Sequence, residues 1–119
     1  MTPKFRGFRK DGKGWVEGYS LKKGNEHCIW DNDSLTMYVI VPESLGMSTT
    51  LPDKHGKEIF GAIGEKGGDV LTCYELKVAI VFEAGQFVGK HLNNDRMADL
   101  QNRNWLQFEI IGNQYESNG

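Results

Sequence analysis

The sequence has few cysteines, no long apolar run and no large excess of charge of one sign. Cys28 and Cys73 are the only cysteines among 119 residues, which excludes a disulfide-rich scaffold. Each lies in an apolar, strand-like segment, so we expect two free thiols that behave as small buried side chains. No run of about 18 apolar residues occurs, and Met1 to Lys4 lead into no apolar segment. We therefore expect no membrane span, no secretory signal and a cytoplasmic location.

The formal net charge of −2 argues against a protein whose whole surface binds nucleic acid. Basic residues do gather near the N-terminus: Lys4, Arg6, Arg9, Lys10 and Lys13. On a strand, successive side chains point to opposite faces, so these residues would not all form one stripe. We favour solvated charges around a hairpin, and a local nucleic-acid site that combines this basic hairpin with nearby aromatic residues stays open as the alternative.

The chain has the pattern of short strands separated by turns rich in glycine, asparagine and aspartate. Alternating or continuously apolar segments predict strands at 4–9, 15–19, 27–30, 37–41, 69–74, 76–82, 87–88 and 105–111. We expect 37–41 to be a central strand and 76–82 to lie in the core, because both are continuously apolar. The glycine-dense segment Gly61 to Gly68 is predicted to be a loop and a flexible connector. The segment 91–104 is the one whose pattern favours a helix.

These elements predict a single domain, residues 1–119, of the mainly β class. Its length suits one domain, and its hydrophobic content of 39% and charged content of 25% are ordinary for a globular protein. Strands recur roughly every ten residues, which favours a small barrel or a highly bent sheet with at most one short helix.

No catalytic or metal-binding pattern stands out. His27 and Cys28 are adjacent, so they would point to opposite faces of a strand, and the closely spaced ligand pairs typical of zinc sites do not occur. The segment 61–68 lacks the order of glycine, lysine and hydroxyl residue that a phosphate-binding loop needs. Carboxylates are plentiful, but the sequence alone pairs none of them for acid–base work. We predict a protein with no enzymatic activity, no cofactor and no metal.

Several segments, in order along the chain, share a family pattern. The first half contains Lys4-Phe5-Arg6-Gly7, Gly14-Trp15-Val16-Glu17-Gly18-Tyr19, Val41-Pro42-Glu43-Ser44-Leu45-Gly46 and Asp53-Lys54-His55-Gly56-Lys57-Glu58-Ile59. The second half contains Gly67-Gly68-Asp69-Val70, Val81-Phe82-Glu83-Ala84-Gly85-Gln86-Phe87 and Phe108-Glu109-Ile110-Ile111-Gly112-Asn113-Gln114-Tyr115-Glu116. Taken together, these segments resemble the YopX family of bacteriophage and prophage proteins over most of the chain.

The resemblance implies turn and structural roles for the signature residues, which are Asp53, Gly56, Lys57, Glu58, Ile59, Asp69, Gly85, Gly112, Asn113 and Tyr115. In the turn from Asp53 to Gly56, we expect the glycine at positive φ. The chain departs from the family pattern at His55, where asparagine is usual, and in the run from Met47 to Thr50. The segment Gly61 to Lys66 is an insertion between the central signature and Gly67.

The resemblance also implies an SH3-like small barrel in the C-terminal part, an N-terminal β-hairpin extension, a phage or prophage origin and no established activity. Exposed hairpin edges can pair with another chain, so self-association is expected. Our leading hypothesis is a non-enzymatic accessory protein in the cytoplasm of a bacterial host, which binds an unidentified protein partner and forms a homo-oligomer. The alternative is a nucleic-acid-binding module that uses the N-terminal basic hairpin.

Overall fold

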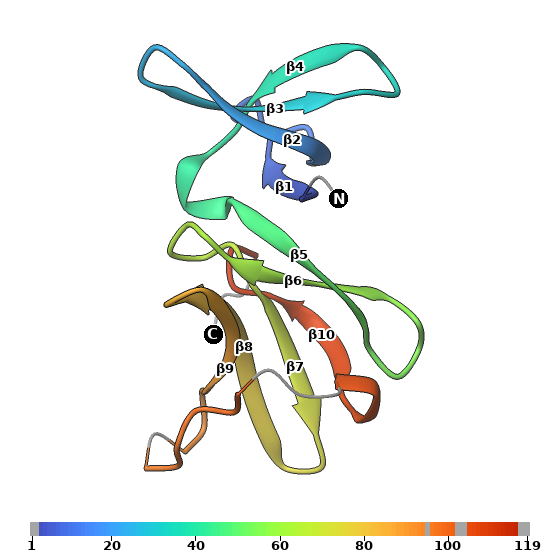
Figure 1. The fold of residues 1–119 in the computed structure, drawn as a ribbon, viewed down its shortest axis with the longest axis vertical. Helices are drawn as coiled ribbons and strands as arrows, with labels where there is room; N and C mark the ends of the chain where they lie inside the picture. Colours follow the sequence, from blue (N-terminus) through green and yellow to red (C-terminus); the bar gives the residue numbers. More distant parts are fainter. Residues whose placement is uncertain (1–2, 95, 102–104, 117–119) are drawn as a thin grey trace.

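The structure is a computed structural model that describes residues 3–94, 96–101 and 105–116, and its regular elements are mainly β-strands. Figure 1 shows two strand-rich parts arranged along the longest axis, with the N-terminal strands above the C-terminal ones. The upper part contains β1 (Phe5–Phe8), β2 (Trp15–Lys23), β3 (Glu26–Asp31) and β4 (Thr36–Val39). The lower part follows the 3-10 turn η1 (Pro42–Ser44). It contains β5 (Gly46–Pro52), β6 (Glu58–Ala62), β7 (Asp69–Cys73), β8 (Leu76–Glu83), β9 (Gln86–His91), the 3-10 turn η2 (Trp105–Gln107) and β10 (Glu109–Asn113). The mainly β class is confirmed.

The strands pair in the order β10-β7-β8-β6-β5-β1-β2-β3-β4, and β9 pairs with β8. The pairings are antiparallel except for one parallel bridge between β6 and β8, at Ala62 and Val81. The two parts are joined where β1 pairs with β5, which places Phe5 opposite Met47 and Arg6 opposite Gly46. Residues near the N-terminus therefore lie directly against the C-terminal part.

Each part encloses its own cluster of buried side chains. In the C-terminal part the fully buried residues are Ile59, Leu71, Val78, Ile80 and Trp105. In the N-terminal part the buried cluster consists of Ile29, Ile40 and Leu45, with Phe5 and Val16 packed against it. Val78 and Ile80 occupy alternate positions on β8, which is the period that puts one face of a strand against the core. The expectation that 76–82 lies in the core is confirmed.

Irregular strand positions bend the C-terminal sheet into a curled half-barrel. The register between β5 and β6 shifts between Ser48 and Pro52, and the register between β10 and β7 shifts between Ile110 and Gly112. Such bulges increase the local bend and twist of a strand. The backbone N–H of Lys54, at the tip of the β5–β6 hairpin, donates to the carbonyl of Phe108 at 2.8 Å. The hairpin tip thus reaches across to the start of β10, whereas the finer SH3-like description stays a prediction.

Three expectations about strands and helices are wrong. The segment 37–41 forms β4, which lies at the end of the strand order and not at its centre. The helix predicted over 91–104 is absent from the described residues of that range, where Leu100 instead forms an isolated β-bridge to Gly89. The strand predicted over 105–111 begins as the 3-10 turn η2, and β10 starts only at Glu109.

The segment from Gly61 to Gly68 is a tightly packed connection and not a flexible one. Gly61 and Ala62 belong to β6, and the loop that follows carries backbone bonds from Ile63 and Gly64 to the carbonyl of Leu45, at 3.0 and 2.8 Å. A Cβ atom on Gly67 would lie 1.8 Å from that same carbonyl oxygen. Glycine is therefore required here, because two backbone segments touch. Within the described residues, no helix is long and apolar enough to cross a membrane.

Candidate functional site

The carboxylate of Asp53 holds the turn between β5 and β6 and ties that turn to β10. It is only 2% exposed, and its Oδ1 accepts the backbone N–H groups of His55 and Lys57, each at 2.9 Å. Its Oδ2 accepts the N–H of Ile110 at 3.0 Å. Burial alone would raise the pKa of this carboxyl, but the bonds from Ile110, Lys57 and His55 outweigh burial and lower it. The charged carboxylate is thus the anchor of the hairpin tip.

The neighbouring signature residues serve the same turn and the core. Gly56 has a φ of 80°, as expected, and its N–H donates to the carbonyl of Asp53 at 3.0 Å. Ile59 is fully buried in the C-terminal cluster. In the turn between β8 and β9, Ala84 and Gly85 have φ values of 52° and 80°. Two consecutive positive φ values are what a two-residue hairpin turn needs to match the twist of its strands.

A buried ion pair joins the two parts of the molecule. The guanidinium of Arg6, on β1, lies 2.8 Å from the carboxylate of Asp69, at the start of β7. Asp69 also accepts the backbone N–H of Phe60 at 2.7 Å. Arg6 lies against two aromatic rings, 4.9 Å from the centre of Trp15 and 4.7 Å from that of Phe60. Burial raises the pKa of the Asp69 carboxyl, and the nearby Arg6 charge offsets this only in part.

The C-terminal signature packs back onto the N-terminal strands. The ring of Tyr115 lies 5.1 Å from that of Phe8 and 5.9 Å from that of Trp15. The Oε1 atom of Glu116 accepts the indole N–H of Trp15 at 3.0 Å and the side-chain amide of Asn113 at 2.9 Å. The signature residues at this end therefore connect strands that are far apart in sequence.

The predicted basic residues lie beside carboxylates. Lys4 is 2.6 Å from Glu58 and 3.6 Å from Glu17, and Arg6 binds Asp69. The remaining pairs are Arg9 with Asp11 at 2.6 Å and Lys10 with Glu26 at 3.9 Å, while Lys13 is exposed and donates its backbone N–H to Asp11. A phosphate would have to compete with these carboxylates for the cations. The structure does not gather the five into one unpaired stripe, and nucleic-acid binding stays a prediction.

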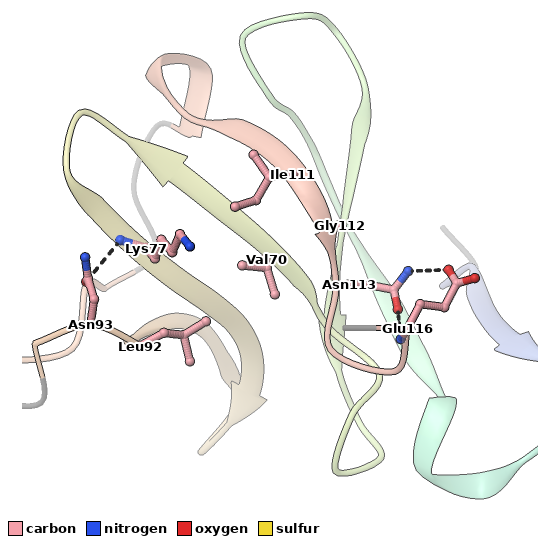
Figure 2. Close-up of a pocket in the computed structure, with 8 residues that line it drawn as sticks. All are labelled: Val70, Lys77, Leu92, Asn93, Ile111, Gly112, Asn113 and Glu116. Carbon is pink, nitrogen blue, oxygen red and sulfur yellow. Dashed lines mark hydrogen bonds between the residues drawn. The ribbon is translucent and has the colours of Figure 1, made fainter. Parts of the chain in front are cut away.

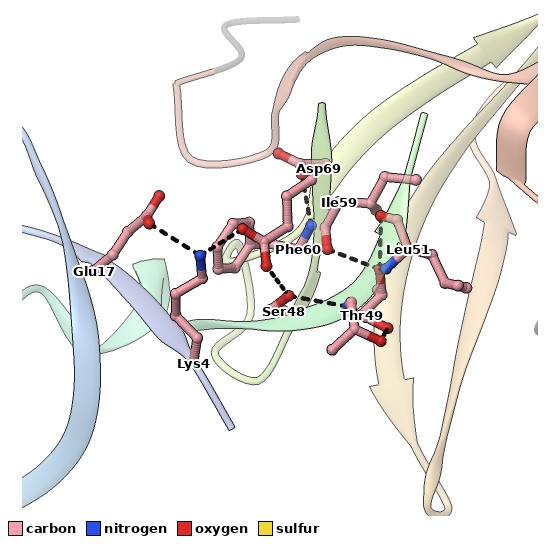
Figure 3. A network of polar contacts seen from close by, with 10 residues as sticks. Lys4, Glu17, Ser48, Thr49, Leu51, Ile59, Phe60 and Asp69 are labelled. Atoms are coloured by element: carbon pink, nitrogen blue, oxygen red, sulfur yellow. Dashed lines mark hydrogen bonds and ion pairs between the residues drawn. The ribbon is translucent and has the colours of Figure 1, made fainter. Parts of the chain in front are cut away.

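A strained bulge in β5 begins at Ser48, which lies near Lys4 in Figure 3. The hydroxyl of Ser48 donates to Glu58 and accepts the backbone N–H of Thr50 at 3.0 Å. Thr50 has a φ of 64°, a conformation that β-branched residues rarely adopt. Backbone strain of this kind often marks functional positions. Here the Ser48 hydroxyl is already engaged on both sides, so its evident role is to hold the bulge.

A hollow of about 500 Å³ lies on the outer face of the sheet formed by β10, β7 and β8 (Figure 2). Val70 forms its apolar floor, and the half-exposed side chains of Leu92 and Ile111 stand beside it, at 51% and 48% exposure. Lys77 and Glu116 lie on opposite sides of this apolar centre. This hollow, with its exposed aliphatic side chains, is the candidate functional site.

No local pattern in the sequence indicates this site. The sequence predicts a helix for Leu92, but this residue directly follows β9. Its backbone N–H donates to the carbonyl of Lys77 at 2.9 Å. Ile111 lies at the register shift of β10, where a bulge changes which face its side chain joins. The pairing of β10 with β7 places Ile111 near Val70, and the bond to Lys77 holds Leu92 beside β8.

The residues suited to metal or thiol chemistry are spread apart in the structure. Within the described ranges, no group of three or more histidine, cysteine, aspartate or glutamate side chains could hold a metal ion. Cys28 is buried, Cys73 is half-buried, and both are free thiols. The expectation that both cysteines are small buried side chains is confirmed for Cys28, whereas Cys73 is only partly buried.

A family model described as YopX protein matches residues 4–119. The chain belongs to the YopX family. The comparison with curated proteins returned no match.

The structure explains why particular amino acids are needed at several positions of the YopX signature. Asp53 needs a carboxylate to accept three backbone N–H groups, and Gly56 needs positive φ. Asp69 meets Arg6, a residue of the family's N-terminal segment. His55, which replaces the usual asparagine, places its Nε2 3.2 Å from the carboxylate of Glu109 on β10. This substitution therefore adds a contact to the same hairpin tip.

Proposed function

We propose that this YopX-family chain is a phage or prophage accessory protein that works by binding protein, including further copies of itself, and not by catalysis. It acts in the cytoplasm of the bacterial host. Family membership supports the phage origin. The use of Asp53, Asp69 and Glu58 in holding turns and ion pairs supports a scaffold role for the signature carboxylates.

The observation that carries this proposal is the pair of half-exposed aliphatic side chains beside the hollow on β10, β7 and β8. Leu92 and Ile111 expose apolar surface to water at a place where a concave floor is also apolar. Exposed apolar patches with a polar surround are typical of protein interfaces. Covering them with another protein surface would be favourable, because apolar area would leave water.

The first test is the mass of the purified protein under native conditions, by native mass spectrometry and by light scattering behind a sizing column. We expect a discrete multiple of the chain mass of 13.4 kDa at micromolar concentration. A monomer across the accessible concentration range would overturn self-association. Turnover of any substrate, lost on Glu58→Gln or Cys73→Ala in a folded variant, would overturn the non-enzymatic part.

A further inference from the structure

The hollow described above belongs to a face that combines an apolar centre with two opposite charges. We call it the Lys77–Glu116 face and define it by Val70, Lys77, Leu92, Ile111 and Glu116. Leu71 and Val78 pair across β7 and β8 and point into the core. Their sequence neighbours Val70 and Lys77 therefore point to the other side of the sheet, where Lys77 is exposed and Val70, only 8% exposed, lies at the bottom of the hollow. Figure 2 shows Val70 and Ile111 between Lys77 and Glu116.

The two charges on this face are available for a partner. Lys77 is exposed, and no ion pair involves its ammonium group among the residues that the structure describes. Glu116 uses Oε1 to accept two uncharged donors, the amide of Asn113 and the indole of Trp15. These bonds fix the carboxylate in place and lower its pKa, so the group is charged at neutral pH. Neither bond neutralises it. The Arg6 charge also lowers the pKa of this carboxyl, but within the described residues Arg6 forms its ion pair with Asp69 and none with Glu116.

A two-fold symmetric interface uses the same patch on both chains, so the patch must complement itself. One cation and one anion on opposite sides of an apolar centre satisfy that condition, because a two-fold rotation lays each charge over its opposite. A patch with charges of a single sign would repel its own copy. The Lys77–Glu116 face therefore has the charge arrangement of a self-complementary surface.

We propose that the Lys77–Glu116 face binds a second copy of this chain about a two-fold axis. Lys77 of each copy meets Glu116 of the partner subunit, and Leu92 and Ile111 are covered at the centre. This inference rests on the proposed self-association and specifies the surface through which it occurs. The two ion pairs set the orientation, and the covered apolar area supplies most of the affinity.

The experiment reverses the charge of Lys77 or Glu116 and measures the dissociation constant of the dimer by analytical ultracentrifugation. Lys77→Glu alone places like charges opposite each other at both contacts of a homodimer, and so does Glu116→Lys alone. We expect each variant to self-associate at least about tenfold more weakly than the wild type. In an equimolar mixture of the two variants, both contacts of a heterodimer again join opposite charges. We expect the mixture to recover the dimer that neither variant forms alone.

Because Glu116→Lys also removes the bonds to Trp15 and Asn113, Ile111→Glu serves as a second probe, and its site is already half exposed. It should abolish the dimer while the circular dichroism spectrum stays that of the wild type. The matched control is Leu35→Asp, an exposed residue in the turn between β3 and β4, which should leave the dissociation constant unchanged.

The outcomes separate the two proposals. A monomeric wild type overturns self-association and, with it, this interface, even if the face captures some other protein. A wild-type oligomer that persists in Lys77→Glu and Ile111→Glu overturns the interface alone and leaves self-association standing. Recovery in the mixture, together with an unchanged control, supports both.

Discussion

At the scale of single residues, two buried carboxylates hold together segments that are distant in sequence. Asp53 and Asp69 are both nearly inaccessible, yet their environments shift their pKa values in opposite directions. Asp53 is surrounded by backbone N–H donors, which favour the charged form. Asp69 has one cation in direct contact, Arg6, and one backbone donor, and for it the loss of hydration is the larger effect on the pKa. The two residues should therefore respond differently to substitution and to pH.

Replacing Asp53 with alanine should destabilise the protein by about 3 kcal/mol, because three backbone N–H groups lose a charged acceptor inside the fold. Urea unfolding followed by far-UV circular dichroism measures this change. The exposed Asp33→Ala, in the turn before β4, is the matched control and should lie within about 0.5 kcal/mol of the wild type. Equal stability of the two variants would contradict the anchoring role of Asp53.

The pKa of Asp69 is raised above its ordinary value of 3.8, which gives its contribution to stability a definite sign. The stability that this group adds is fully present below pH 3.8 and is lost as pH rises through its higher folded pKa. Compared with Asp69→Asn, the wild type should therefore gain stability on acidification from neutral pH toward pH 3.8. Unfolding curves of both proteins across this range test the sign. A difference that moves the opposite way would show that Arg6 outweighs burial.

At the scale of elements, strands and turns could be predicted from the sequence because their signals are local. Alternating, β-branched or continuously apolar segments predict β1, β2, β3 and β8, and the aspartate and glycine of residues 53–56 predict the turn there. The helix predicted over 91–104 is wrong for the described residues of that range, because the backbone of Leu100 pairs with Gly89 of β9 and its side chain packs against the C-terminal cluster. The candidate site could not be predicted either, because Leu92 and Ile111 are distant in sequence and only the pairing of the strands brings them to one hollow.

Substitutions at two glycines distinguish the cost of an unfavourable backbone conformation from the cost of a steric clash with the backbone. Gly56 lies at a φ of 80° with open space around its Cα, so Gly56→Val should cost about 1–2 kcal/mol, from the left-handed conformation alone. Gly67→Ala would place Cβ 1.8 Å from the carbonyl oxygen of Leu45. It should cost more than Gly56→Val, although alanine is smaller, because the backbone of Leu45 must move. Thermal unfolding of both variants gives the order, and the reverse order would contradict the packed connection.

At the scale of the whole molecule, the two clusters of buried residues are linked by a few long-range contacts. β1 pairs with β5, Arg6 binds Asp69, and Tyr115 packs against Phe8 and Trp15. The family resemblance covers both parts, and the structure shows that segments from the start and the end of the chain meet at this junction. Residues near the C-terminus thus stabilise the N-terminal part. Glu116, for example, accepts the indole N–H of Trp15 although the two residues are 101 positions apart.

Tyr115→Ala should therefore loosen the N-terminal part more than the C-terminal part. Losing its ring contacts should cost about 1–2 kcal/mol, which multiplies the locally open population by about 5–30. Cys28 is fully buried in the N-terminal part and reports such opening by thiol labelling, in a Cys73→Ser background that removes the half-buried second thiol. Labelling of Cys28 should accelerate by that factor in Tyr115→Ala, and Tyr74→Ala, at a side chain that is 97% exposed, should leave the rate unchanged. If Tyr115→Ala lowers the melting temperature without faster labelling of Cys28 under native conditions, the two parts unfold only together, and the junction is as stable as either core.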